Sequence, residues 1–280
     1  MYACLSPEAI GIRMALPDAL NLAAVTGFEG LELNIGEAAG LAEQRGVEYV
    51  KDLFARAGLR VGNWGFPVEF RRDDAAYRAD MEKLPRLAHL AQQLGATRCA
   101  TWMLPFSDEL RFMEHFDVMA GRLRPAAQVL ADQGVRLGLE FVGPRTLRQG
   151  HKFSFISTQE GMLGLCSAIG AGNVGLLLDS FHWYTARGTK QDIASLRNQD
   201  VVLVHLNDGV AGKGPDEQLD LVRTLPGETG VIDLGAFLGE LNAIGYDGPV
   251  VVEPFSERLK AMSPRDAAAA TRQALRQVGL

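Results

Sequence analysis

The chain has 280 residues, of which 47% are hydrophobic and 22% are charged, and its formal net charge is −6. These proportions are typical of a globular protein with a substantial core, and the length suits one large α/β domain. The negative charge argues against a nucleic-acid partner, and no apolar run approaches the ~20 residues that cross a membrane.

Short apolar runs alternate with helical patterns along the whole sequence. Runs rich in β-branched residues and bounded by Gly or Pro are typical of strands that are buried on both faces. Such runs occupy residues 2–5, 28–35, 59–65, 97–103, 135–141, 174–179, 201–206 and 248–253. Helical patterns follow them at residues 17–26, 38–57, 73–94, 108–133, 158–170, 189–198, 232–244 and 264–278.

Several of the helical patterns carry start and stop signals. Ser157 and Glu160 have the spacing of a capping box, and Asp233 stands where an N-cap should precede a helix. Glycines end six of the patterns directly before the next strand, at Gly27, Gly58, Gly95, Gly134, Gly170 and Gly245.

Eight strand–helix units without a Pro/Ser-rich linker predict an α/β fold with one closed (β/α)8 TIM barrel. We expect this single domain to span residues 1–280. An open doubly wound sheet is the alternative, but the glycine-rich dinucleotide fingerprint that should follow its first strand is absent.

Four of the expected strands end in a side chain that can bind a metal ion or transfer a proton. These residues are Glu140, Asp179, His205 and Glu253. Ligand sites of such barrels lie at the carboxyl ends of the strands, so the four side chains should share one edge. A single acid after an apolar run is more often a helix cap, but four such residues on successive strands favour a site. Three carboxylates and an imidazole suit a divalent cation and leave a carboxylate to move protons.

At these residues the sequence resembles the sugar isomerase/epimerase superfamily with the xylose-isomerase-like TIM barrel, in particular its ketose 3-epimerases, hydroxypyruvate isomerase-like proteins and inosose isomerases or dehydratases. The matching pieces are Leu139-Glu140, Leu178-Asp179-Ser180-Phe181-His182, Val204-His205-Leu206-Asn207-Asp208, Val251-Val252-Glu253-Pro254 and the segment from Pro226 to Asp233. The resemblance implies one divalent metal ion (Mn, Mg, Co or Zn in different members) held by Glu140, Asp179, His205 and Glu253. It also implies that Glu140 and Glu253 flank the substrate as an acid/base pair.

This residue set is consistent with chemistry beside a carbonyl group. Removal of a proton next to a ketone leaves an enediolate, which a metal ion that bridges the carbonyl and hydroxyl oxygens stabilises. Two carboxylates on opposite faces of the carbon can take the proton from one side and return it to the other. The sequence therefore predicts an isomerase or epimerase of a keto sugar or keto-inositol.

Two other enzyme classes remain. A dehydratase or lyase that acts on a keto sugar, keto-inositol or oxidised glycoside begins with the same proton removal and then expels a β-substituent. A phosphodiester nuclease on a related barrel needs extra histidines and a basic groove, whereas this chain has five histidines and a net charge of −6.

Further residues are candidates for contact with the substrate. His182 lies three residues after Asp179, and the resemblance implies that it reaches a substrate oxygen; it also implies that Arg223 binds the substrate. Trp64 and Trp102 fall at strand ends, where indole rings can stack on a sugar and exclude water. The alternatives are a packed histidine, an exposed loop arginine and tryptophans that cap the core.

The loop at residues 143–157 departs from the pattern of many ketose 3-epimerases, which carry a second substrate-binding glutamate where this chain has Thr146. Its basic residues are Arg145, Arg148, His151 and Lys152. Of these, we expect Lys152 to contact an electron-rich, acidic or larger substrate, with solvated loop charge as the alternative.

We expect a cytoplasmic protein, since the N-terminus has no signal-peptide pattern and the three cysteines are widely spaced. The expected partner is a small-molecule carbohydrate, without nucleic acid or membrane. The sequence leaves a homo-oligomer open.

Overall fold

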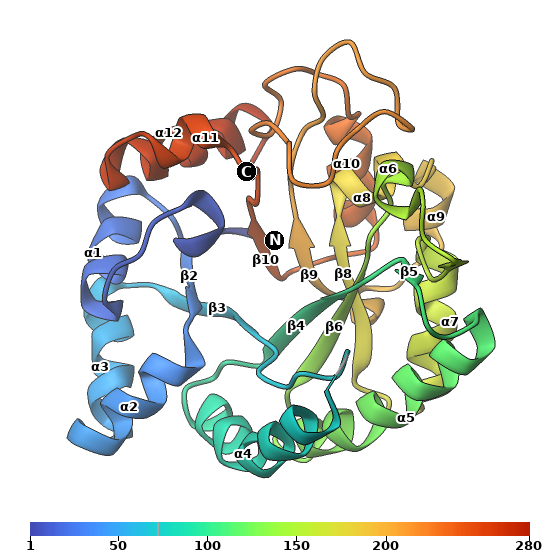
Figure 1. Ribbon diagram of the computed structural model, residues 1–280. Coiled ribbons are helices and arrows are strands. Elements are labelled where there is room, and N and C mark those ends of the chain that lie inside the picture. Colours follow the sequence, from blue (N-terminus) through green and yellow to red (C-terminus); the bar gives the residue numbers. More distant parts are fainter. Residues whose placement is uncertain (72) are drawn as a thin grey trace.

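Eight parallel strands close into a barrel with helices around it in the computed structural model, which describes residues 1–71 and 73–280 (Figure 1). In their order around the barrel the strands are β1 (Tyr2–Leu5), β10 (Pro249–Val251), β9 (Val201–His205), β8 (Val174–Asp179), β6 (Arg136–Phe141), β4 (Arg98–Met103), β3 (Arg60–Gly65) and β2 (Gly30–Leu33). The first and last strands pair in parallel with Tyr2 opposite Pro249, which closes the ring. The predicted α/β TIM barrel is therefore confirmed.

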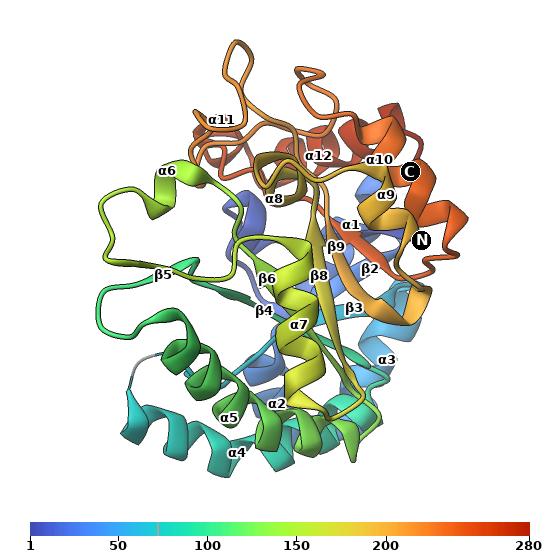
Figure 2. The same ribbon diagram turned by 90° about the vertical axis from the view of Figure 1, so that its right-hand side faces the viewer.

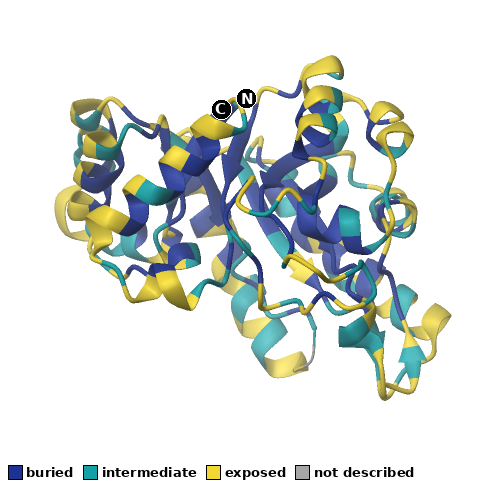
Figure 3. Ribbon diagram, turned by 90° about the horizontal axis from the view of Figure 1, so that it is seen from above, coloured by how far each residue is buried: buried dark blue, intermediate teal, exposed yellow. Residues whose placement is uncertain are grey.

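The outer layer consists of helices whose apolar faces pack against the strands. Its longer helices are α1 (Leu16–Thr26), α2 (Ile35–Arg45), α3 (Val47–Ala57), α4 (Asp74–Gln93), α5 (Phe112–Ala131), α7 (Gln159–Ile169), α10 (Leu234–Ala243) and α12 (Pro264–Gln277). Its shorter helices are η1 (Glu8–Ile10), α6 (Arg145–Arg148), α8 (Ser180–Thr185), α9 (Lys190–Ala194), η2 (Asn198–Asp200) and α11 (Glu257–Lys260). Figure 3 shows buried residues on the strands and on the inward faces of the helices. None of the helices in the described ranges is long and apolar enough to cross a membrane.

The predicted helix ends agree closely with the structure. All six glycines that the sequence marks as stops adopt positive φ angles between 67° and 82°. The Asp233 side chain accepts a hydrogen bond from the Ala236 N–H at 2.9 Å and so caps α10. The cap of α7 is Thr158 rather than Ser157, because the Thr158 hydroxyl accepts from the Gly161 N–H.

Several features differ from the predicted pattern. The helix expected at 189–198 ends at Ala194 as α9, and the helix expected at 108–133 begins only at Phe112 as α5. The helix expected at 38–57 is two helices, α2 and α3, which meet at Gly46, where the backbone has φ 87° and ψ 155°. Two short strands, β5 (Phe106–Ser107) and β7 (Phe153–Ser154), pair antiparallel outside the barrel. Figure 2 shows that β5 and the segment with α6 project outward from the barrel. We call residues 104–111 and 145–156 the arm.

Candidate metal centre

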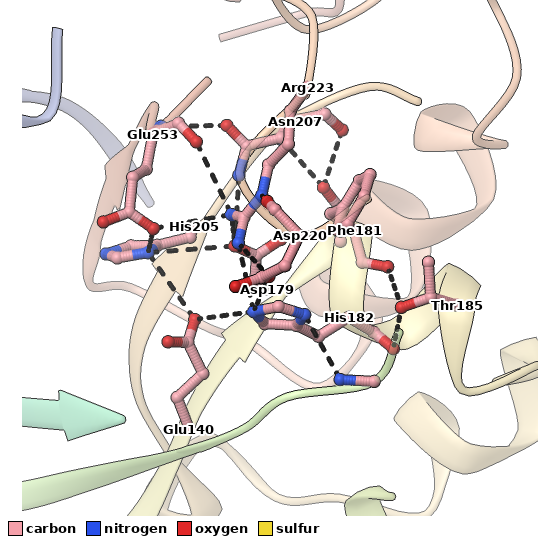
Figure 4. A network of polar contacts seen from close by, with 12 residues as sticks. Glu140, Asp179, Phe181, His182, Thr185, His205, Asn207, Asp220, Arg223 and Glu253 are labelled. Atoms are coloured by element: carbon pink, nitrogen blue, oxygen red, sulfur yellow. Dashed lines mark hydrogen bonds and ion pairs between the residues drawn. The ribbon is translucent and has the colours of Figure 1, made fainter. Parts of the chain in front are cut away.

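The four residues predicted to bind a metal ion meet at the carboxyl ends of the strands (Figure 4). One ligand atom from each of Glu140, Asp179, His205 and Glu253 lies within 4.8 Å of the corresponding atoms of the others. The strand register explains this convergence, because Asp179 at the end of β8 is paired with His205 at the end of β9. Glu140 is the last residue but one of the neighbouring strand β6, and Glu253 lies two residues after the end of β10.

Two atoms of this cluster lack hydrogen-bond partners among the described residues. His205 Nδ1 lies 3.4 Å from Glu253 Oε2, 3.7 Å from Glu140 Oε1 and 3.9 Å from Asp179 Oδ2. Within the described ranges, Glu140 Oε1 and His205 Nδ1 are buried and accept or donate no hydrogen bond. Buried polar atoms without partners are costly, and a cation with oxygen and nitrogen ligands would satisfy both. The residue set thus fits a divalent metal ion.

A buried arginine balances the carboxylates. Arg223 is 5% exposed, and its Nη1 donates to Asp179 Oδ2 at 2.7 Å and lies 3.4 Å from Glu253 Oε2. Its Nη2 donates to Asp220 Oδ1 at 3.0 Å. Asn207 donates to the same Asp179 oxygen and accepts the Glu253 N–H. These contacts fix the orientation of the Asp179 carboxylate.

The two glutamates of the cluster have pKa values shifted in opposite directions. Burial raises the pKa of Glu140 well above its usual range, and the nearby Asp179 and Glu253 carboxylates act in the same direction. Burial also acts to raise the pKa of Glu253, but His205 and Arg223 outweigh it and the pKa is lowered. Burial acts to lower the pKa of His205, yet the surrounding carboxylates raise it to about 9. The cluster therefore holds groups that can carry and accept protons.

His182 lies beside the cluster and is only 1% exposed. Its Nδ1 lies 3.3 Å from the Gly143 N–H, and its Nε2 faces Nη2 of Arg223, so each ring nitrogen has a donor group next to it. Nε2 lies 3.9 Å from Glu140 Oε1 and 3.2 Å from Nη2 of Arg223. Burial and the Arg223 charge lower the pKa of His182 to about 3, which keeps the imidazole neutral.

A cavity of about 300 Å³ opens beside the cluster at the barrel mouth. Glu140, His205 and Glu253 form one part of its wall, and Trp102 and Glu32 belong to the same wall. Trp102 is 45% exposed, and the Arg71 guanidinium stacks over its ring at 4.3 Å from the centroid. The cavity is thus polar at the cluster and carries an accessible aromatic side chain.

The structure places two of the predicted substrate contacts away from the cavity. Trp64 is fully buried, and its indole N–H donates to the Ala96 carbonyl at 3.0 Å. Its neighbours Asn63 and Gly65 line the cavity, so Trp64 between them faces the helices, as the alternation of side chains along a strand requires. Lys152 is exposed on the arm and does not line the cavity.

The position of Lys152 follows from the way the loop folds. Instead of covering the barrel mouth, the loop pairs with β5, and the Lys152 N–H donates to Asp108 at 2.9 Å. His151 stacks on Phe106 at 3.4 Å between ring centroids and contacts the same Asp108 carboxylate. The basic residues at this end of the loop therefore belong to the arm.

Sequence reasoning missed three residues of the site. Asp220 pairs with Arg223 but lies in loop sequence without a distinctive pattern. Asn207 orients Asp179 and stands in the matching piece from Val204 to Asp208, but no role was predicted for it. Glu32 lines the cavity from the middle of β2. Glu32 stands between two buried leucines, and this alternation is a sequence signal for a side chain that faces the barrel interior.

The structure is an α/β barrel with a buried cluster at the carboxyl ends of its strands that could hold a divalent cation. Residues 20–278 match the family described as the xylose isomerase-like TIM barrel. The chain belongs to this family, which confirms the resemblance predicted from the sequence.

Two relatives have named activities. A 3-dehydroshikimate dehydratase of Pseudomonas aeruginosa is 28% identical over 266 residues, which are 91% of this chain and 38% of that protein. The chain thus spans well under half the length of this dehydratase. An inosose isomerase of Bacillus velezensis is 27% identical over 220 residues, which are 78% of this chain and 71% of that protein.

Solved structures share the whole fold. A xylose isomerase domain protein from Alicyclobacillus acidocaldarius has a TM-score of 0.89 and 33% sequence identity, and the match covers 99% of this chain and 98% of that one. The IOLI protein, whose structure contains a zinc atom, has a TM-score of 0.82 and 20% identity over 99% of this chain and 98% of that one. At 20% identity the similarity to the IOLI protein shows a shared fold alone.

Proposed function

We propose that the protein is a divalent-metal-dependent isomerase or epimerase of a keto sugar or keto-inositol that acts through an enediolate. The observation that carries this proposal is the cluster of Glu140, Asp179, His205 and Glu253, whose ligand atoms lie within 4.8 Å of one another at the edge of a cavity. The inosose isomerase among the relatives supports the reaction class. The zinc atom in the IOLI structure supports a metal ion in this type of barrel.

The same four residues would hold the metal ion. When bound, a divalent cation supplies positive charge beside the carbonyl group and stabilises the enediolate that forms when the adjacent carbon loses a proton. Arg223 keeps the Asp179 carboxylate oriented in this set.

Glu140 and Glu253 form the proposed acid/base pair. Both line the cavity, and their pKa values are shifted in opposite directions, because burial dominates at Glu140 whereas His205 and Arg223 dominate at Glu253. One takes the proton from the carbon beside the carbonyl, and the other returns a proton to the substrate.

Three further side chains are proposed to bind the substrate. His182 contacts a substrate oxygen from its position beside Glu140 and Arg223. Arg223 lies behind the cavity wall, with its Nη1 3.4 Å from Glu253 Oε2, and acts on the substrate through its positive charge. Trp102 packs its free ring face against the C–H face of the sugar, because its other face is covered by Arg71.

A dehydratase or lyase is the second candidate. The observation that favours it is the 28% identity with a 3-dehydroshikimate dehydratase over 91% of this chain. Elimination begins with the same proton removal by one of the two glutamates. The other glutamate then gives its proton to the β-hydroxyl group, which leaves as water.

A substrate panel tests the proposal. The protein is loaded in turn with Mn, Co, Mg or Zn and assayed with keto sugars, keto-inositols and oxidised glycosides. An isomer of unchanged mass supports the first candidate, and a product that has lost water or another β-substituent and absorbs in the ultraviolet supports the second. A chelator should abolish either activity, and full activity in a metal-free preparation would contradict both.

A further inference from the structure

The strands that carry the metal cluster form one half of the barrel. In the closed strand order β6, β8, β9 and β10 are consecutive, and the four residues of the cluster lie on these strands or just after them. The other half consists of β4, β3, β2 and β1, so β2 and β3 lie across the barrel from β8 and β9 (Figure 1). Side chains of β2 and β3 that reach the cavity therefore face the cluster from the opposite wall.

Three polar side chains line the cavity from this opposite half. They are Ser6 directly after β1, Glu32 on β2 and Asn63 on β3. Ser6 and Asn63 are buried, whereas Glu32 is partly exposed. Burial raises the pKa of Glu32, and hydrogen bonds from Ser6 and Asn63 act in the other direction. The three side chains thus form one hydrogen-bonded set, which we call the Glu32 group.

The Glu32 carboxyl group has no lysine or arginine partner in the part of the chain that the structure describes, and no such residue there belongs to the cavity wall. The charged groups that act on its pKa, His205 and Glu253, belong to the metal cluster across the cavity. The Arg71 guanidinium, which stacks on Trp102, donates to the Trp102 carbonyl. A carboxyl group in this position can accept hydrogen bonds from the hydroxyl groups of a ligand and disfavours a second anion.

The cavity is small enough for one ligand to touch both halves of the barrel. Its volume of about 300 Å³ corresponds to the liquid volume of ~10 water molecules at ~30 Å³ each, which suits one sugar or inositol. A keto sugar with its carbonyl group at the metal cluster therefore places its remote carbon atoms at the Glu32 group. Hydroxyl groups on those atoms can donate to Glu32 and accept from Asn63.

We propose that Glu32, together with Ser6 and Asn63, binds the hydroxyl groups at the end of the substrate remote from the carbonyl group, and that it selects an uncharged polyol over one with a carboxylate or phosphate at that end. The inference rests on the proposed function, because it takes the cavity as the site of a keto sugar. It assigns to Glu32 the choice of substrate, whereas the metal cluster carries out the reaction.

Two pairs of compounds test this assignment: D-fructose with D-fructuronate, and D-tagatose with D-tagaturonate. Within each pair the compounds differ only at C6, where a carboxylate replaces the hydroxymethyl group. NMR titration of the metal-loaded protein gives the ratio of the two dissociation constants. In Glu32→Gln the affinity for the uronate relative to the ketose should rise about tenfold, because the amide keeps the size of the side chain and removes its charge. Binding of the uronate carboxylate to the metal ion affects parent and variant alike, so the comparison isolates Glu32.

Glu32→Ala is a second, independent variant. It also removes the charge, so it should raise the relative affinity for the uronates in the same way. It should in addition weaken the binding of both ketoses about tenfold or more, because hydrogen bonds to the carboxylate are lost.

Glu32→Asp and Glu29→Gln are the controls. The first keeps the charge and should keep the relative affinity of the parent protein. The second removes one charge directly before β2, at an exposed residue that does not line the cavity, and should also keep it. Thermal unfolding establishes that the variants are folded. A relative affinity that stays unchanged in the folded charge-removing variants, or no detectable binding of the four compounds to the parent protein, would overturn the proposal.

The outcome separates from that of the proposed function. Deuterium exchange beside the carbonyl group, followed in the same samples, tests the reaction by itself. Exchange with a relative affinity that does not respond to Glu32→Gln would keep the reaction and remove the specificity role. The expected change in relative affinity without any exchange would keep the Glu32 group as a binding site and contradict the reaction.

Discussion

At the residue scale, the cluster at the barrel mouth gathers buried charged side chains whose hydrogen bonds are incomplete without a bound ligand. Three carboxylates surround His205, and two buried atoms of the cluster lack hydrogen bonds among the described residues. Buried charge of this kind is unfavourable for folding, so its presence points to a ligand that compensates for it.

Removal of the single imidazole should therefore weaken metal binding. Loss of a residue that only hydrogen-bonds to a metal ligand lowers metal affinity roughly 10–100-fold. We expect His205→Ala, which removes a ligand itself, to lower the affinity for Mn, Co and Zn by more than this. Equilibrium dialysis with elemental analysis measures this loss. His89→Ala, on the exposed face of α4, should bind metal like the parent protein; equal binding by His205→Ala would remove the imidazole from the site.

Replacement of either proposed acid/base group should slow the reaction strongly. Glu140→Gln and Glu253→Gln should each lose on the order of 10²–10⁴-fold in rate, with some metal loss, because the amide cannot transfer the proton. Rates are compared at saturating metal, with Glu48→Gln as the control because its side chain is 81% exposed. Full turnover by a metal-bound Gln variant would withdraw the proton-transfer role from that glutamate.

His182 should make stability depend on pH. Its pKa is about 3 in the folded protein and about 6.5 when exposed, so below pH 6.5 only the unfolded chain binds this proton. The free energy of unfolding should therefore fall from pH 6.5 downward by up to about 1.4 kcal/mol per pH unit from this group. Above pH 6.5 the imidazole is neutral in both states and has no such effect.

Urea unfolding of the chelator-treated protein between pH 4.5 and 7 measures this dependence. His182→Asn keeps an acceptor for the Gly143 N–H and should show a shallower decline toward acid. Identical slopes in the two proteins would mean that His182 is protonated in the folded state.

At the scale of the elements, the strands could be predicted because each is a short apolar run that ends at a turn signal. The helix expected at 38–57 could not be divided correctly, because helical periodicity continues on both sides of Gly46. The break depends on one backbone conformation, with φ 87° and ψ 155°, in a region that only glycine adopts readily.

Replacement of two nearby glycines by alanine should change the stability of the protein in opposite directions. Gly46→Ala should destabilise the protein by about 1–3 kcal/mol, because the Cβ atom strains this conformation. Gly40→Ala, inside α2 with nothing within 4 Å of the new Cβ, should stabilise it by about 0.5–1 kcal/mol. Urea midpoints measure both effects, and a neutral Gly46→Ala would show that the break does not require glycine.

The arm escaped prediction for a different reason. Each of its strands has two residues, and they are held by contacts between distant segments such as the Phe106–His151 stack. Two-residue strands leave no periodic pattern in the sequence. Lys152 was misplaced for this reason, whereas the error at Trp64 came from ignoring the alternation of side chains along β3.

At the scale of the whole molecule, the position of the cluster could be predicted because a parallel barrel brings all strand ends to one rim. Glu140 and Glu253 are 113 positions apart in the sequence, and the closed strand order is sufficient to bring them together. The substrate side of the cavity could not be predicted in the same way. Its shape depends on loops and on the register of β2 and β3, where the pairing shifts between Leu31 and Leu33.

The central claim is that the reaction begins with removal of a proton beside a carbonyl group. The most direct test follows deuterium by NMR when the metal-loaded protein converts its substrate in heavy water. We expect solvent deuterium at the carbon next to the carbonyl, and less deuterium in the product formed by Glu140→Gln or Glu253→Gln. A product that retains its original hydrogen and contains no solvent deuterium would indicate an internal hydride shift and contradict the two-glutamate mechanism.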